Sequence, residues 1–276
     1  MQHHTFGSHA GPILFYFHGA PGAPVEAEVF HACAQAHGVQ VVCQDRFAVD
    51  KGTTGSDYYQ LLADDIVALA KEGRVHVVGF SIGAFVALQV CRLIPDRVES
   101  LHLVSAAAPL EAGDFLDHMA GKSVFRLAKS APFLFLLLSS WQGLLARYSP
   151  NFLFRMLFAS AAAGDQLLCS DPAFRNWTTN LLTDCFGRNM SGYVRDVLAY
   201  VAPWQACLKD VSVKAHLWHG DQDNWSPIGM SEYLRQQIAG PVELHKLRGL
   251  SHYSSLYAAV PEICQQIART RVGEAE

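Results

Sequence analysis

The sequence predicts an α/β protein with a mostly parallel central sheet, helices on both faces of that sheet, and one inserted helical segment. Short continuous apolar runs alternate with segments of helical periodicity through residues 13–104, and the alternation returns after residue 212. Runs of this kind are typical of strands that helices cover on both faces. Between the two regions, residues 109–203 hold long apolar and aromatic stretches without a convincing strand.

The predicted strands and helices follow one another along the chain. The strand-like runs lie at residues 13–17, 39–43, 75–80, 98–104, 213–218 and 242–247. The helical patterns lie at residues 25–37, 57–71, 82–94, 230–238 and 256–268. Pro95 ends the third helix, because proline lacks the N–H donor that a helix interior needs. The amphipathic helix at 57–71 gathers four apolar residues on one side: Leu61, Leu62, Ile66 and Leu69.

The insertion at 109–203 is predicted to form a helical cap over one end of the sheet. Residues 1–108 and 204–276 then form the core, and no low-complexity linker separates the two parts. Within the insertion, residues 131–138 read APFLFLLL, a run much shorter than the about 20 apolar residues that span a membrane. We expect a buried helix there and no stable membrane span, with docking at a membrane interface as the alternative.

The composition argues against several classes of partner. The net charge is −4 and the lysines and arginines are scattered, so we expect no nucleic-acid binding. The seven cysteines include no Cys-x-x-Cys pair, and the first residues contain no apolar run typical of a signal peptide. Both features indicate reduced thiols in a cytoplasmic protein.

The N-terminal segment carries three histidines that need an interpretation of their own. His3, His4 and His9 lie within a polar stretch, without a carboxylate or cysteine beside them. Metal sites combine several ligands in a fixed geometry. We therefore expect a flexible, histidine-rich terminus here rather than a metal site.

The most specific motif is Gly79-Phe80-Ser81-Ile82-Gly83, which fits the pattern Gly-x-Ser-x-Gly. It stands between a predicted strand and a predicted helix, so the serine must occupy a sharp, strained turn. The flanking glycines leave room for strand and helix to approach closely. The turn lifts the Ser81 hydroxyl above the sheet at a helix N-terminus, whose dipole favours developing negative charge. The alternative is a glycine-rich loop with an incidental serine.

A serine nucleophile needs a base to take its proton, and that base an acid to orient it. Asp221 and Asp223 both follow the strand at 213–218, and His252 follows the strand at 242–247. The order serine, acid, histidine is the one expected when the nucleophile stands at a strand-turn-helix of this kind. Four other histidines lie inside predicted strands, where packing or surface roles are expected: His76, His102, His216 and His245.

With these motifs, the chain resembles the α/β-hydrolase superfamily over nearly its whole length. It is most similar to bacterial hydrolases with a serine nucleophile and a helical cap, and its HGAPG segment resembles the HGGPG of proline iminopeptidases. The matching segments are HGAPGAP (18–24), DRFAVDKGT (45–53), VHVVGFSIGAFVAL (75–88), IPDRVESLHLVSAAAP (94–109), HLWHGDQDNWSP (216–227) and GLSHYS (249–254).

The resemblance implies roles for individual positions. It places the acid three residues after Gly220, at Asp223, and leaves Asp221 to brace the loop. It also assigns the two oxyanion-hole donors to the backbone N–H groups of Ala20 and Ile82, since Pro21 has no N–H.

Two segments depart from the family pattern. The segment before residue 13 is too short for a full pair of leading antiparallel strands, so we expect the sheet to be trimmed at that edge. The small glycine-rich turn that usually follows Asp45-Arg46 is replaced by residues 47–50, which read FAVD. This loop is expected to shape the pocket differently.

The resemblance and the residues together predict a serine hydrolase that needs no metal and no cofactor. A serine at position 81 argues against dehalogenase and epoxide-hydrolase chemistry, which use an aspartate there. We expect cleavage of a small-molecule ester, thioester or lactone with an apolar part held by Phe133, Leu137 and Trp141 of the cap. The alternatives are an aminopeptidase of the proline iminopeptidase type, a lyase or cofactor-free dioxygenase, and a non-catalytic ligand receptor.

Overall fold

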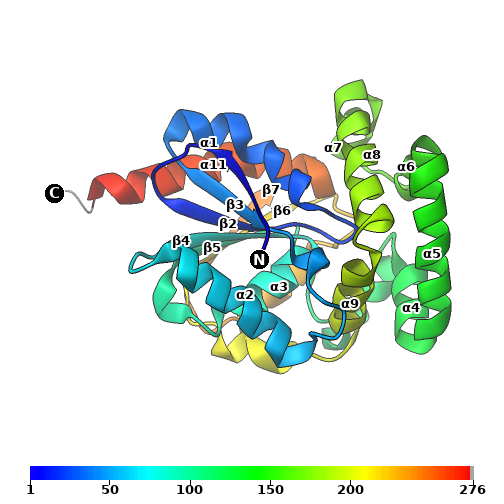
Figure 1. The fold of residues 1–276 in the computed structure, drawn as a ribbon, viewed down its shortest axis with the longest axis horizontal. Coiled ribbons are helices and arrows are strands. Elements are labelled where there is room, and N and C mark those ends of the chain that lie inside the picture. The colour runs from blue at the N-terminus through cyan, green and yellow to red at the C-terminus, as the bar shows by residue number, and fades with distance from the viewer. Residues whose placement is uncertain (274–276) are drawn as a thin grey trace.

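The computed structural model describes residues 1–273, and the side chains of residues 1–270, as a single sheet with helices on both faces (Figure 1). The seven strands lie in the order β1-β3-β2-β4-β5-β6-β7. Every neighbouring pair is parallel except β1 with β3. The strands are β1 (His3–Gly7), β2 (Ile13–Phe17), β3 (Gln40–Gln44), β4 (Val75–Phe80), β5 (Val98–Val104), β6 (Ala215–Gly220) and β7 (Val242–Leu247). The predicted, mostly parallel α/β architecture is confirmed.

Helices cover both faces of the sheet, as the continuous apolar strands require. On one face lie α1 (His31–His37) and α11 (His252–Gly273), and on the other lie α2 (Gly55–Ala70) and α3 (Ile82–Cys91) (Figure 1). The helix α10 (Gly229–Gln237) packs against β6 and β7. Short 3-10 helices connect these elements: η1 (Pro24–Phe30), η2 (Arg46–Ala48), η3 (Pro95–Arg97) and η6 (Gln205–Asp210).

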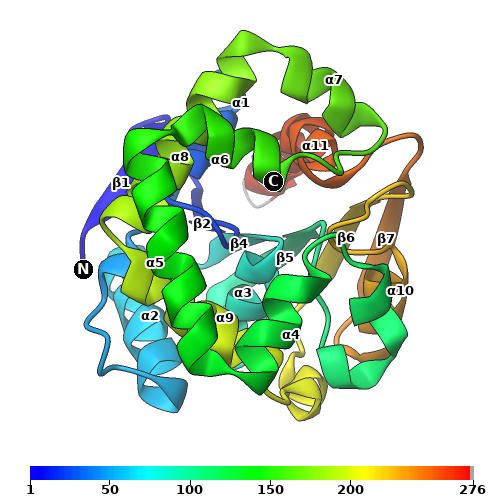
Figure 2. The same ribbon diagram turned by 90° about the vertical axis from the view of Figure 1, so that its right-hand side faces the viewer.

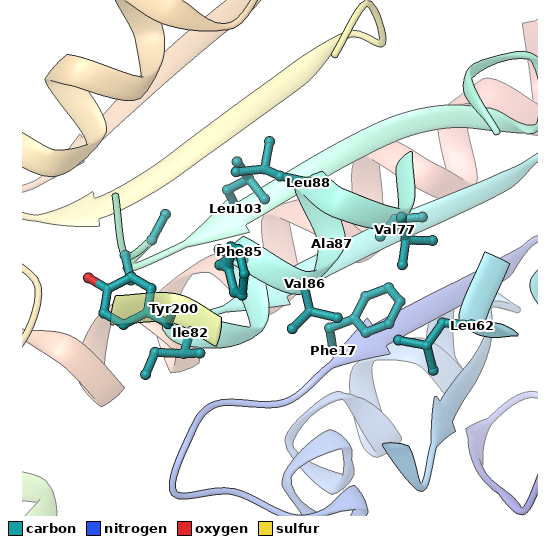
Figure 3. Packing of buried hydrophobic residues seen from close by; sticks show 14 of the residues in the cluster. Phe17, Leu62, Val77, Ile82, Phe85, Val86, Ala87, Leu88, Leu103 and Tyr200 are labelled. Carbon is teal, nitrogen blue, oxygen red and sulfur yellow. The ribbon is translucent and has the colours of Figure 1, made fainter. Parts of the chain in front are cut away.

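The larger of the two apolar cores lies between the sheet and α2 and α3. Figure 3 shows Phe17, Val77 and Leu103 of the strands packed against α3. The buried face of α2 differs from the predicted one. Leu61 and Leu69 are 41% and 38% exposed, while Tyr58, Tyr59, Leu62, Ala63 and Ile66 are buried. The prediction was wrong for those two leucines because the tyrosines turn the buried stripe of the helix by part of a turn.

The N-terminal segment also differs from its prediction. It forms the edge strand β1, antiparallel to β3, and His3 Nε2 lies 2.6 Å from Asp65 Oδ2 of α2. A carboxylate distant in sequence therefore contacts the histidine, and the expected flexible terminus was wrong. A single leading strand does agree with a sheet trimmed at this edge.

Between residues 109 and 203 the chain forms helices joined by loops and contains no strand, and it gathers at one end of the sheet (Figures 1 and 2). This segment comprises η4 (Leu110–Ala112), η5 (Asp114–His118), α4 (Lys122–Ser130), α5 (Pro132–Tyr148), α6 (Pro150–Leu157), α7 (Gly164–Ser170), α8 (Pro172–Gly187) and α9 (Met190–Val201). The apolar run at 131–138 begins α5, but Phe133, Leu134, Leu136 and Leu137 are exposed, so the expected burial was wrong for most of it. None of the helices in the described part of the chain combines the length and apolar character needed to cross a bilayer.

Candidate active site

Ser81 lies between β4 and α3 on backbone angles that residues with a side chain rarely adopt. Its φ of 56° and ψ of −125° are those of a strained turn. A Cβ atom at Gly79 would lie 2.6 Å from Ala84 Cα, and one at Gly83 would lie 2.1 Å from Phe17 O. Both glycines are therefore required for this close approach of strand and helix. The turn presents Ser81 at the N-terminus of α3.

The loop that follows β2 runs beside this turn. Ala20 of the loop and Ile82 of α3 line the same cavity as Ser81. The first turn of α3 is pressed against the loop, because a Cβ at Gly83 would also lie 2.3 Å from His18 O. Both predicted oxyanion donors are thus brought to the neighbourhood of the serine.

A buried glutamate that the sequence interpretation missed anchors this loop. Glu26 Oε1 accepts hydrogen bonds from Gly19 N at 2.7 Å and from the Tyr16 hydroxyl at 2.9 Å. Burial of the Glu26 carboxyl raises its pKa to about 7, although both hydrogen bonds and the nearby Arg46 act in the opposite direction. The only signal in the sequence is an acidic residue within an otherwise apolar segment.

An ion pair between core and cap lies beneath the same loop. Arg46 Nε donates to Asp196 Oδ2 of α9 at 2.9 Å, and neither side chain is exposed. Arg46 also donates to Gly19 O at 3.4 Å. Phe47 is buried and packs edge-on against His18, with the ring centroids 4.5 Å apart. The FAVD loop therefore packs under α9, and its residues are not among those described as lining the cavity.

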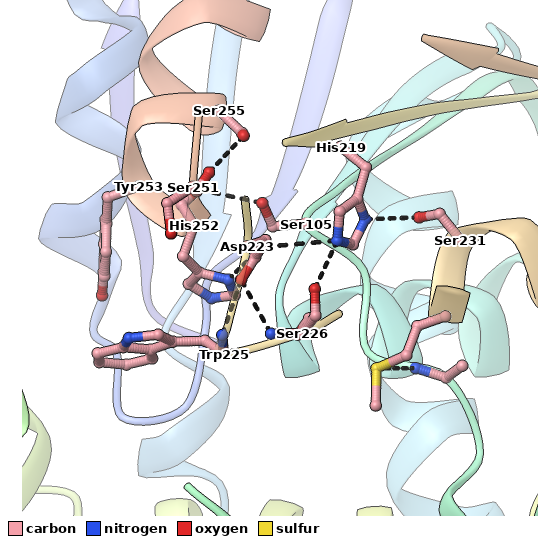
Figure 4. Close-up of polar contacts among 12 residues, drawn as sticks. Ser105, His219, Asp223, Trp225, Ser226, Ser231, Ser251, His252, Tyr253 and Ser255 are labelled. Carbon is pink, nitrogen blue, oxygen red and sulfur yellow. Dashed lines mark hydrogen bonds and ion pairs between the residues drawn. The ribbon is translucent and has the colours of Figure 1, made fainter. Parts of the chain in front are cut away.

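Asp223 and His252 form a buried pair at the ends of β6 and β7 (Figure 4). His252 Nδ1 donates to Asp223 Oδ2 at 2.8 Å, and Asp223 Oδ1 accepts from the backbone N–H groups of Trp225 and Ser226, each at 2.9 Å. Burial favours the neutral form of both groups, but their mutual charge and hydrogen bond outweigh it. The pKa of Asp223 is therefore lowered and that of His252 is raised.

Aromatic rings fix the plane of the His252 imidazole. The Trp225 ring stacks on it at 5.3 Å and an interplanar angle of 21°, and the Phe80 ring lies 4.8 Å away. Phe80 directly precedes Ser81, so the base is held next to the nucleophile turn. The described contacts include no hydrogen bond between the Ser81 hydroxyl and His252. Such bonds are often long without substrate.

The other candidates near the acid have bracing contacts. Asp221 is exposed, and its Oδ1 accepts from Gly249 N at 2.8 Å. This hydrogen bond joins the loop that carries Asp223 to the loop that precedes His252. His219 Nε2 donates to Ser226 O at 2.6 Å and its Nδ1 accepts from the Ser231 hydroxyl at 2.6 Å (Figure 4). Neither residue contacts His252 in the way that Asp223 does.

Asp165 of the cap holds the base loop from above. Its carboxylate accepts from Tyr253 N at 3.1 Å, from Ser254 N at 2.7 Å and from the Ser254 hydroxyl at 2.7 Å. The two backbone N–H groups belong to the first turn of α11, the helix that begins at His252, and have no partner within the helix. The negative charge of Asp165 is favourable there because the helix dipole is positive at its N-terminus. Sequence spacing does not reveal this contact, because 88 residues separate Asp165 from Tyr253.

A cavity of about 320 Å³ lies between the Ser81 turn and the cap. Leu138 and Trp141 of α5 line it, but Phe133 and Leu137 do not, and those two are 69% and 51% exposed. The substrate contacts expected for Phe133 and Leu137 were therefore wrong, because α5 turns its other side to the cavity. Trp141 does line the cavity, and its contact with a substrate stays a prediction.

Two residues of the cavity lining each carry a buried polar atom without a hydrogen-bond partner in the described structure. Gln142 lines the cavity and is 3% exposed, and its Oε1 atom has no hydrogen bond. The Trp225 Nε1 donor, on a residue that also lines the cavity, is buried in the same unpaired state. Sequence reasoning missed Gln142, because the helical pattern did not reveal which side of α5 faces the sheet.

Comparisons with known proteins agree with this arrangement. Residues 12–259 match the family model described as alpha/beta hydrolase fold. A comparison with curated proteins finds no significant match.

Similar solved structures include three enzymes. The bromoperoxidase of Bacillus anthracis has a TM-score of 0.67 and 16% identity, over 97% of this chain and 94% of that one. The enol-lactonase of Burkholderia xenovorans has a TM-score of 0.64 and 16% identity, over 99% and 95%. The esterase of Exiguobacterium antarcticum has a TM-score of 0.60 and 20% identity, over 99% and 94%. At these identities the likeness concerns the fold alone.

Proposed function

Since the chain belongs to the α/β-hydrolase fold family, we propose that it is a serine hydrolase that cleaves a carboxylic ester with an apolar part. Thioesters and lactones, which undergo the same acyl transfer, belong to the same proposal. The observation that carries it is the strained Ser81 turn at the floor of the cavity, beside the paired Asp223 and His252. We also propose that residues 109–203 form the cap and residues 1–108 and 204–276 the catalytic core.

The proposed reaction proceeds through an acyl-enzyme. His252 takes the proton of the Ser81 hydroxyl as its oxygen attacks the ester carbonyl carbon, and Asp223 stabilises the imidazolium that forms. The N–H groups of Ala20 and Ile82 donate to the oxyanion. His252 then protonates the departing alkoxide. Water, activated by the same histidine, releases the acid and restores Ser81.

The cavity supports a substrate that is mostly apolar and uncharged. Its described lining contains no lysine, arginine, aspartate or glutamate. A charged substrate would lose its hydration there without gaining an ion pair.

The same lining gives the aminopeptidase alternative no support, because a free amino terminus needs an acidic partner. Asp165, a buried carboxylate of the cap, is engaged at the start of α11. A lyase, a cofactor-free dioxygenase or a ligand receptor would differ by turning over no ester.

The test is a series of p-nitrophenyl esters from acetate to octanoate. Each buried methylene contributes about 0.8 kcal/mol, so kcat/KM should rise roughly fourfold per methylene until the cavity is full. The neighbouring leucines of α5 offer a matched pair. Leu138→Ala should flatten the rise, because Leu138 lines the cavity, whereas Leu137→Ala should leave it unchanged. A fall from acetate onward would contradict the apolar substrate, and no turnover of any ester would contradict the hydrolase.

A further inference from the structure

A row of histidines crosses the sheet beneath α11. His102 of β5 pairs in register with His216 of β6, and His216 pairs with Glu243 of β7, with His245 two residues further along β7. His76 of β4 lies beside the same row and shares its partner Ser100 with His102. His216 is near the start of β6, whereas Asp223 follows the end of that strand. The row is therefore distinct from the catalytic groups.

The histidines of the row differ in their hydrogen bonding. His76 Nδ1 and His102 Nε2 lie 2.8 and 2.9 Å from the Ser100 hydroxyl, and His102 Nδ1 accepts from the Trp218 indole at 3.4 Å. His216 Nδ1 and His245 Nε2 face each other at 3.4 Å. The Glu243 carboxylate lies beside both rings, with Oε2 3.4 Å from His216 Nδ1 and Oε1 3.8 Å from His245 Nε2.

Two of these separations, from His216 Nδ1 to His245 Nε2 and to Glu243 Oε2, are 3.4 Å and match the edge of a tetrahedral metal site. Bonds of about 2.0–2.1 Å directed to the corners of a tetrahedron hold neighbouring ligand atoms about 3.4 Å apart. Two imidazoles and a carboxylate are a ligand set that Zn²⁺ accepts together with a water molecule. We propose that His216 Nδ1, His245 Nε2 and a Glu243 oxygen bind one Zn²⁺ ion per chain.

The surroundings prepare both rings for this task. The Trp218 ring stacks on His245 at 3.9 Å and the His102 ring stacks on His216 at 5.0 Å, so the ring planes are fixed. Glu243 is largely exposed and leaves a path for the ion.

Bound Zn²⁺ would join β6 to β7. The first of these strands leads to Asp223 and the second to His252, so the ion would stabilise the strand pair that carries the acid and the base. We therefore expect Zn²⁺ to raise the midpoint of thermal unfolding without being required for ester hydrolysis.

The experiment measures Zn²⁺ affinity by competition with a chromophoric chelator, and the visible absorption of the Co²⁺-substituted protein. The proposal predicts one tight site with a tetrahedral Co²⁺ spectrum. Glu243→Gln and His245→Gln, both at partly exposed positions, should weaken binding by more than about tenfold. The control Glu262→Gln changes an exposed glutamate of α11 outside the cluster and should have no effect. Equal affinity in all four proteins would overturn the proposal, since binding would then arise elsewhere, for example at the N-terminal histidines.

A second observation concerns the outer face of the cap. Five large side chains of α5 recur every three or four residues, and each is between 45% and 71% exposed: Phe133, Leu137, Trp141, Leu144 and Tyr148. Exposed apolar stripes of this size mark interaction sites. Residues 119–164, which include this stripe, contain five lysines and arginines and no acidic residue, so this segment is cationic in a chain of net charge −4. One of the five, Arg126, pairs with Asp117 outside the segment.

This face continues into the cavity. Trp141 and Met156 are 45% and 37% exposed, and both also line the cavity that contains Ser81. An apolar stripe on a cationic segment beside an apolar cavity fits a membrane with anionic headgroups, from which an apolar substrate would enter directly. We infer that the α5 face docks on anionic lipid. Its benefit to catalysis rests on the proposed function, but the binding itself does not.

Sedimentation with lipid vesicles tests this inference. The protein should bind vesicles of phosphatidylglycerol and phosphatidylcholine, and binding should weaken with salt and with phosphatidylcholine alone. The double variant Leu137→Ser and Leu144→Ser should lose binding and still hydrolyse p-nitrophenyl acetate, whereas Leu61→Ser, a change of an exposed leucine on α2, should behave as wild type. Failure to bind, or a dimer in solution that the double variant makes monomeric, would overturn the inference.

Discussion

Glu26 provides a quantitative test of how the oxyanion loop is held. Its carboxyl is fully buried and its pKa is raised from 4.5 to about 7. Between these two pH values the folded chain keeps a proton that the unfolded chain has lost. Stability contributed by this group is therefore complete below pH 4.5 and is lost as the pH rises to about 7. The shift corresponds to about 3 kcal/mol at neutral pH and above.

The perturbation is Glu26→Gln, because an amide oxygen can still accept from Gly19 N and the Tyr16 hydroxyl but carries no charge. The variant should match wild type near pH 4.5, and should exceed it by up to about 3 kcal/mol in free energy of unfolding near pH 8. Urea denaturation across this pH range measures the free energy of unfolding of both proteins. The contributions of all other titrating groups are the same in both and drop out of the difference. The exposed Glu28 on the same 3-10 helix gives the control Glu28→Gln, for which no such slope is expected. A difference between Glu26→Gln and wild type that does not vary with pH would refute this reasoning.

Three further predictions concern the turn and the triad. Gly83→Ala should yield little folded protein in an expression and circular dichroism test, because the new methyl group would lie 2.1 Å from a backbone oxygen of β2; normal folding would contradict the close approach. Asp165→Ala should lower the free energy of unfolding, measured in urea, by about 1–2 kcal/mol, because the start of α11 loses its hydrogen-bond acceptor. It should also move the acidic limb of the pH profile of kcat/KM to lower pH, since the charge of Asp165 raises the pKa of His252. An unmoved limb would show that Asp165 acts only on the helix. Asp223→Asn should reduce kcat by several orders of magnitude and Asp221→Asn by far less; the reverse order in steady-state assays would exchange their roles.

Local patterns were sufficient to predict the fold and the core of the candidate site. The strand-turn-helix context of Ser81 and the post-strand positions of Asp223 and His252 depend on short segments, which the sequence displays directly. The parts that were missed depend on contacts between distant segments. Glu26 and Asp165 each hold backbone N–H groups that their own sequence neighbourhood does not identify as partners.

The cap shows the same limit. Helical periodicity indicated α5 but not its orientation, since this helix is apolar around most of its circumference. Leu137 and Leu138 are equivalent in the sequence, yet one faces solvent and the other the cavity. Apolar residues are usually assigned to the core, but α5 keeps an apolar stripe exposed. The side of α5 that is buried is decided by its packing against α8 and α9.

The most direct test of the central claim is to identify the residue that becomes covalently modified. The protein is treated with a fluorophosphonate, and the labelled peptide is located by mass spectrometry in wild type, in Ser81→Ala and in Ser160→Ala, which removes the other serine that lines the cavity on the cap side. The account predicts one label per chain, on Ser81, that persists in Ser160→Ala and disappears in Ser81→Ala together with ester hydrolysis. A label on another serine, or hydrolysis that survives in Ser81→Ala, would contradict it.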